Sequence, residues 1–207
     1  MRLLLILEII GTVAFAASGA IVGIQKKMDI FGVSILGLTA AVGGGILRDL
    51  ILNITPPAAF LNPVFAVTAI LVSIVIFVPA VRTAFEHKKK LYDALILVMD
   101  SIGLGLFTVV GVQAATEAMA ERNLFLISFV GVLTGVGGGI LRDIFAGHTP
   151  YIFNKHFYAC ASIIGAWTCL LLWEPLGQVP AMIAGSLLTV VLRLLAARFR
   201  WSLPRAR

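Results

Sequence analysis

GGGILRDL at residues 43–50 occurs a second time, almost unchanged, as GGGILRDI at residues 137–144. Seven consecutive residues are identical, and the two segments lie 94 positions apart. The match includes three glycines and an Arg-Asp pair within apolar sequence, so chance is a poor explanation for it. The chain therefore contains an internal repeat, with one copy at about 1–85 and the other at about 91–175. Further pairs, at offsets of 94 and 92, are Thr55-Pro56 with Thr149-Pro150, Glu8 with Asp100, and Gly11 with Gly103.

The composition places this repeat in a membrane. Of the 207 residues, 60% are hydrophobic and only 13% are charged, and the mean hydropathy is +1.04. A soluble domain carries roughly 25% charged residues, so this chain has too little polar surface to face water on all sides. Its apolar runs are near the ~20 residues that cross a bilayer as a helix, and they lack the alternation of a transmembrane barrel. We therefore predict an all-α membrane protein.

Seven apolar segments are candidate membrane spans, separated by short polar or proline-containing connections. Three fall in each repeat, and the seventh, at about 179–195, stands outside both. No stretch has room for a soluble domain, so residues 1–207 are expected to form a single transmembrane domain. The predicted spans are Leu3–Ile24, Ile30–Leu52, Ala59–Val81, Leu91–Ala115, Leu124–Phe145, Phe157–Trp173 and Val179–Leu195.

The number of spans per repeat predicts how the copies are related. Because three is odd, the second copy must enter the membrane from the opposite side. This gives an inverted repeat, related by a pseudo-two-fold axis in the membrane plane. Proteins of this architecture place ion and substrate paths near the midplane, at the repeat interface and on discontinuous helices.

The basic residues predict the orientation of the chain. Thirteen Lys and Arg residues fall on one side of the predicted spans and three on the other, which places the C-terminus in the cytoplasm and the N-terminus outside. The net charge of +6 does not indicate nucleic acid as a partner, because the basic residues are not interleaved with exposed aromatic residues. The basic, amphipathic tail at 193–207 is expected to contact anionic lipid headgroups. The three basic residues on the outer side of the predicted spans are Arg2, Arg48 and Arg122.

The glycine triplets Gly43–Gly45 and Gly137–Gly139 allow two interpretations. Each glycine costs about 1 kcal/mol in a helix interior, so three in a row favour a break, and in lipid a break is tolerated only against water or protein. This interpretation predicts a pore-lining interruption of spans 2 and 5, and we prefer it. The alternative is close packing of small residues between helices. Thr39 and Thr134 precede the triplets by about one turn and could offer hydroxyls to an ion, although such groups more often bond within their own helix.

The charged pairs Arg48-Asp49 and Arg142-Asp143 also lie within predicted spans, where charge is costly. Adjacent helical residues do not face each other, so we expect each arginine to find its partner elsewhere. The expected partners are the acidic residues that lie at a similar depth in the membrane, which are Glu8 for Arg48 and Asp100 for Arg142. The alternative is that both arginines extend to the membrane surface. In either case the acidic residues could attract cations to the two mouths.

No motif in the sequence indicates an enzyme. There is no phosphate-binding loop, nucleophile elbow or HExxH motif. The histidines do not form metal-ligand spacing with a cysteine or an acidic cluster. We therefore expect no metal, no cofactor and no catalytic activity.

The duplicated GGGILRD motif, in a chain of this length with seven spans, resembles the prokaryotic branch of the trimeric intracellular cation (TRIC) channel family, whose bacterial members are also described as glycine transporter-like. The resemblance implies a homotrimer in the prokaryotic plasma (inner) membrane, with a pore in each protomer that passes K⁺ and also Na⁺ passively. It also places Gly43–Gly45 and Gly137–Gly139 at the pore. Two other hypotheses stay open, a secondary transporter for glycine or another small solute and a membrane scaffold.

Overall fold

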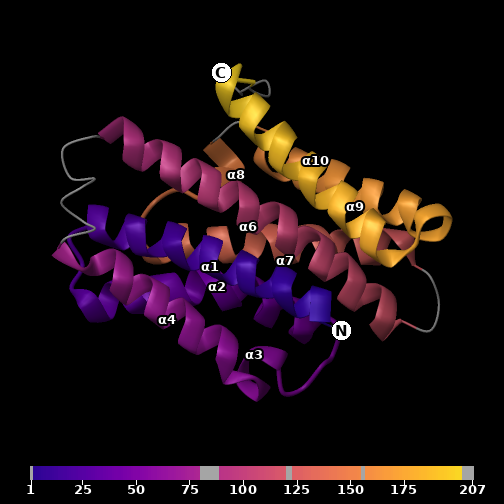
Figure 1. The fold of residues 1–207 in the computed structure, drawn as a ribbon, viewed down its shortest axis with the longest axis horizontal. Coiled ribbons are helices and arrows are strands. Elements are labelled where there is room, and N and C mark those ends of the chain that lie inside the picture. The colour runs from indigo at the N-terminus through magenta and orange to yellow at the C-terminus, as the bar shows by residue number, and fades with distance from the viewer. Residues whose placement is uncertain (1, 80–88, 120–122, 155–156, 202–207) are drawn as a thin grey trace.

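The computed structural model describes residues 2–79, 89–119, 123–154 and 157–201, and within them every regular element is a helix. The predicted all-α class is therefore confirmed for the described part of the chain. Figure 1 shows the long helices packed side by side along one axis. The helices are α1 (Arg2–Gln25), α2 (Ile30–Ile51), α3 (Ala58–Leu61), α4 (Pro63–Phe77), α6 (Lys89–Ala118), α7 (Leu124–Phe145), α8 (Tyr151–Asn154), α9 (Tyr158–Leu176) and α10 (Gln178–Arg198).

Six of the described helices are long and apolar enough to cross a membrane, namely α1, α2, α6, α7, α9 and α10. The predicted third span, Ala59–Val81, is divided into α3 and α4, because Asn62 caps α4 through its side chain and Pro63 follows at the first helical position. The 15 residues of α4 extend about 22 Å, less than the ~30 Å of a hydrocarbon core. The end of this predicted span, residues 80–81, lies outside the described residues.

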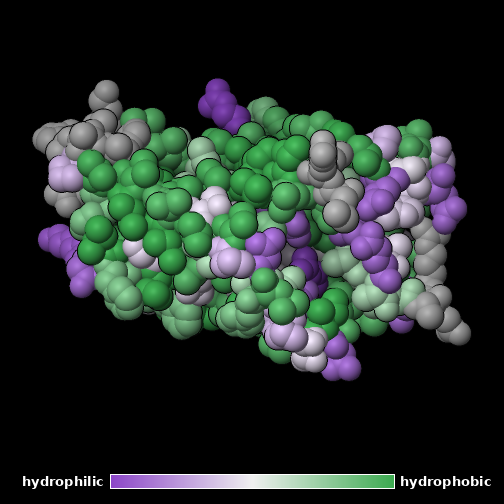
Figure 2. Space-filling view, turned by 60° about the horizontal axis from the view of Figure 1, so that its bottom comes forward, coloured by the Kyte–Doolittle hydropathy of each residue, from purple (hydrophilic) through white to green (hydrophobic). Residues whose placement is uncertain are grey.

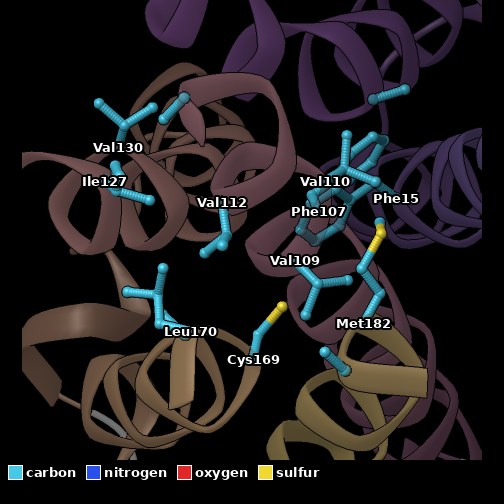
Figure 3. Packing of buried hydrophobic residues seen from close by; sticks show 14 of the residues in the cluster. Phe15, Phe107, Val109, Val110, Val112, Ile127, Val130, Cys169, Leu170 and Met182 are labelled. Atoms are coloured by element: carbon cyan, nitrogen blue, oxygen red, sulfur yellow. The ribbon is translucent and has the colours of Figure 1, made fainter. Parts of the chain in front are cut away.

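The main apolar core is formed by buried residues of α1, α2, α4, α6, α7, α9 and α10. Figure 3 shows Phe15 and Phe107 facing each other, with their ring centroids 5.5 Å apart, beside Val110 and Met182. Large apolar side chains also cover much of the outside, and Figure 2 shows an extensive hydrophobic surface with hydrophilic side chains at the ends and near the middle. A bundle that is apolar outside as well as inside suits lipid as its solvent.

Equivalent helices of the two repeats run in opposite directions. In Figure 1, α1 starts at the end marked N and α6 starts at the other end, and α2 and α7 are opposed in the same way. The short helices α3 and α8 follow α2 and α7 and lie on opposite sides of the bundle, at the bottom and the top of this view. Each repeat therefore presents its Arg-Asp segment at a different end.

Candidate functional site around the duplicated segments

The glycine triplets lie inside continuous helices, so the predicted helix break is wrong. Gly43–Gly45 falls within α2 and Gly137–Gly139 within α7, and both helices continue for about two more turns. A helical glycine keeps its backbone hydrogen bonds, and its cost of about 1 kcal/mol is small enough for tertiary packing to outweigh.

The glycines serve the close approach of α2 to α7. A Cβ added to Gly44 would overlap the carbonyl oxygen of Thr134, and a Cβ added to Gly138 would overlap the carbonyl oxygen of Ala40. Small residues at a crossing let two helix backbones come this close. The alternative interpretation, close packing between helices, therefore describes these two glycines.

The two repeats meet through equivalent residues. Gly44 and Gly138 occupy the same position in each copy, and a Cβ on Gly44 would lie 3.3 Å from the backbone nitrogen of Gly138. Phe15 and Phe107 are likewise equivalent and stack on each other (Figure 3). These equivalent residues therefore lie where the two repeats contact each other.

The third glycine of each triplet differs from the others. A Cβ added to Gly45 would meet only the Arg48 side chain, at 3.9 Å, whereas one added to Gly139 would lie 2.8 Å from the Tyr158 hydroxyl and 3.5 Å from Asp100 Oδ1. The space beside the helix is therefore open in the first repeat and filled in the second.

Each arginine of the duplicated motif pairs with the aspartate that follows it, contrary to the prediction. Arg48 Nε donates to Asp49 Oδ1 at 2.7 Å, and Arg142 Nε donates to Asp143 Oδ1 at 2.9 Å. The rule that helical neighbours do not face each other describes Cβ directions. A long arginine side chain near the end of a helix can bend back far enough to reach its neighbour.

The second oxygen of each aspartate fixes a short helix. Asp49 Oδ2 accepts a hydrogen bond from the backbone nitrogen of Ala58, where α3 begins, at 2.8 Å. Asp143 Oδ2 accepts one from the backbone nitrogen of Tyr151, where α8 begins, at 2.9 Å. The Arg-Asp motif thus joins the end of a long helix to the start of a short helix, with the same hydrogen bonds in both repeats.

In the second repeat Arg142 is completely buried in a polar cluster. Its Nη1 donates to Asp100 Oδ1 at 2.5 Å, so the expected contact between these residues is present, and also to the Ser18 hydroxyl of α1. The guanidinium carbon lies 5.2 Å from the ring centroid of Tyr151. Burial raises the pKa of the Tyr151 hydroxyl above its ordinary value, so this ring stays neutral at neutral pH. Arg142 therefore does not extend to the membrane surface.

In the first repeat the corresponding region is a cavity. Glu8, Arg48 and Asp49 all line it, but Glu8 forms no ion pair with Arg48, so the expected contact between them is absent. The cavity holds about 40 Å³, more than a single water needs. Its other lining residues are Thr12, Ala41, Val42, Gly45, Ala58, Ala59, Phe65 and Phe107.

The two threonines near the triplets are not part of this cavity. The Thr134 hydroxyl donates to the carbonyl of Val130 at 2.7 Å, as threonines in helices commonly do. Thr39 is partly buried and lies outside the cavity lining. The structure therefore brings neither hydroxyl to the charged residues.

A second, wider cavity of about 610 Å³ lies at the opposite end of α1. It combines basic and acidic groups, and the loop residue His148 is one of them. The last residues of the basic tail, 202–207, lie outside the described residues, so its predicted contact with lipid stays a prediction. The residues that line the cavity are Ile24, Gln25, Lys26, Lys27, Tyr92, Asp93 and His148.

Three participants in the charged clusters were not identified from the sequence. Ser18 and Tyr158 join from helices far along the chain, and the guanidinium carbon of Arg193 lies 4.8 Å from the Tyr158 ring centroid. Only Arg193 carries a signal in the sequence, because a buried charge within a predicted span is rare and calls for a partner.

The fold and these clusters define a polytopic α-helical membrane protein with two related copies of one charged segment. The glycine transporter family model matches residues 5–80 and 97–174, two segments that follow the two repeats. The chain is 35% identical to the inner membrane protein YadS of Escherichia coli K12, over 96% of this chain and 93% of the relative. The chain therefore belongs to this family of membrane proteins.

Solved structures extend the relationship to prokaryotic TRIC channels. One, from work on conductance through TRIC cation channels, has 37% sequence identity and a TM-score of 0.85, and it covers 98% of this chain and 96% of that one. The TRIC trimeric intracellular cation channel orthologue of Rhodobacter sphaeroides has 29% identity and a TM-score of 0.87, over 97% of this chain and all of the other. The family resemblance expected from the duplicated motif is confirmed, and the chain has the TRIC channel fold.

Proposed function

We propose that the protein is a passive channel for monovalent cations, K⁺ and also Na⁺, with a pore in each protomer. The observation that carries this proposal is the likeness, over nearly the whole chain, to structures described as cation channels. Those descriptions apply to the relatives, and they support the same activity here because the shared fold includes both repeats.

The charged residues support a path for cations between the repeats. The cavity beside Glu8 lies in the first repeat, and the paired Arg142 and Asp100 lie in the second. We propose that the path follows α2 and α7 from the open space beside Gly45 to the side of α7 that bears Gly139, where the Tyr158 hydroxyl lies in this structure. Gly44 and Gly138 support this path through packing, and Thr134 is left out because its hydroxyl is bonded within its helix.

We propose an inverted repeat, a homotrimer and a cytoplasmic C-terminus as the setting for this path. The opposed directions of α1 and α6 and the contacts between equivalent residues support the inversion. The trimeric relative supports the oligomeric state, and the predominance of Lys and Arg on one side of the spans supports the orientation.

A carrier for glycine or another small solute is the alternative that the description of the family model suggests. Purified protein in a planar bilayer under a KCl gradient separates the two. The channel predicts unitary currents that reverse near the K⁺ equilibrium potential. Absence of current together with saturable glycine uptake into proteoliposomes would overturn the channel in favour of the carrier.

A further inference from the structure

We propose that the cavity of the first repeat is a binding site for one monovalent cation, with the Glu8 carboxylate and the Thr12 hydroxyl as its protein ligands. This inference rests on the proposed channel function and specifies where an ion binds along the path. Glu8 and Thr12 lie four residues apart in α1, so their side chains lie on the same face of the helix, and both line the cavity.

Thr12 lines the cavity, and its hydroxyl bonds to no residue that the structure describes. The residue as a whole is only 1% exposed. The buried hydroxyls of Thr108, Thr134 and Thr189 instead each donate to the carbonyl four residues earlier. The Thr12 hydroxyl therefore faces the cavity, where an ion or a water can be its partner.

The charges around the cavity suit a cation with a single charge. Arg48 and Asp49 neutralise each other through their hydrogen bond. Glu8 forms no ion pair with a described residue, so it leaves one net negative charge at the cavity. A monovalent cation balances this charge, whereas a divalent cation would leave an excess positive charge close to the Arg48 guanidinium. Charges interact strongly in a site that is largely removed from water.

The equivalent position in the second repeat offers no such site. Leu104 replaces Thr12, and the equivalent of Glu8 is Asp100, which is paired with Arg142. The Tyr158 hydroxyl fills the space beside Gly139 that is open beside Gly45. The geometry therefore points to the first repeat, and not to the equivalent position of the second, as the place of the cation site.

Binding of K⁺ to purified protein tests this site without relying on current. Thermal unfolding is followed as KCl replaces N-methyl-D-glucamine chloride at constant ionic strength, since a ligand that binds the folded state raises the melting temperature. We expect Glu8→Gln to weaken the apparent K⁺ affinity about tenfold or more. Thr12→Val, which keeps the shape of the side chain, is expected to weaken it about threefold, because only one ligand is lost.

The control is Glu117→Gln, because Glu117 is exposed near the same end of the bundle and does not line the cavity. This variant is expected to keep the wild-type K⁺ dependence, and an equal loss in Glu117→Gln and Glu8→Gln would overturn the site. A K⁺ dependence that survives Glu8→Gln would overturn it as well. If binding follows the expected pattern but bilayers carry no current, the site stands and the channel fails. If currents are normal and K⁺ has no effect on unfolding, the channel stands and the site fails.

Discussion

The two Arg-Asp segments have the same sequence and the same local hydrogen bonds, yet their surroundings differ. In the first repeat Arg48 lines a cavity together with Glu8, which forms no ion pair with it. In the second repeat Arg142 is completely buried against Asp100 and Ser18. In both repeats the aspartate is hydrogen-bonded to the start of a short helix. The repeats differ in the space beside the third glycine, which is open at Gly45 and filled at Gly139.

This difference indicates that the two copies have divided their roles. A buried arginine bonded to several helices holds the bundle together, because removing it would leave carboxylates uncompensated. An arginine beside an open cavity can instead shape the field that an ion experiences. The same motif thus contributes mainly to stability in one repeat and to the proposed path in the other.

The largest expected effect is the loss of the buried arginine. We expect Arg142→Met to lower the free energy of unfolding by about 3–5 kcal/mol, because Asp100 and Asp143 would remain buried without their partner. The matched variant Arg48→Met is expected to cost about 2 kcal/mol, because the hydrogen bond to Asp49 is lost beside an open cavity. Unfolding in mixed detergent micelles measures both variants, and equal losses would contradict the division of roles.

The next largest effect is expected at the crossing of α2 and α7, where both repeats contribute an equivalent glycine. Gly44→Ala and Gly138→Ala are each expected to lower the free energy of unfolding by about 3 kcal/mol, because the added Cβ meets a backbone carbonyl that cannot move alone. Gly45→Ala is the control and is expected to keep the stability or raise it by up to about 1 kcal/mol, because open space lies beside Gly45 and alanine is the better helix former. If all three variants unfold alike, close packing is not the reason for these glycines.

A smaller effect concerns the link from α1 to the buried arginine. Ser18→Ala removes a hydrogen bond to a charged group, so we expect a loss of about 1.5 kcal/mol in the same unfolding measurement. Ser34→Ala is the control, because the Ser34 hydroxyl bonds only to the carbonyl of Ile30 in its own helix. A Ser18→Ala variant as stable as Ser34→Ala would show that this link does not hold the second repeat together.

The sequence was sufficient for the duplication, the helical class and the contact between Asp100 and Arg142. Each of these follows from a pattern in the chain or from the depth of a charge in a membrane. The division of the third span at Asn62 was missed because hydropathy averages over a cap that a single polar residue provides. The helix break was wrong because glycine has the same local signature whether it frees the backbone or allows a close helix crossing.

The contacts that distinguish the two repeats could not be predicted. Tyr158 fills the space beside Gly139 from a helix nineteen positions further along the chain, and Ser18 reaches Arg142 from the first helix. Such contacts depend on how helices are rotated about their own axes, which the repeat pattern does not specify. The likeness of the two motifs therefore concealed the difference between their surroundings.

The accessibility of Thr12 and Leu104 tests the comparison most directly, because these positions are equivalent in the two repeats. Thr12→Cys and Leu104→Cys are made in a chain whose own cysteines, Cys160 and Cys169, are replaced by alanine. Current block by Ag⁺, a monovalent cation that reacts with thiols, is then timed in bilayers. We expect the Thr12→Cys variant to be blocked at least about tenfold faster, since Thr12 lines the cavity and Leu104 does not. Equal rates, or faster block of Leu104→Cys, would contradict this expectation.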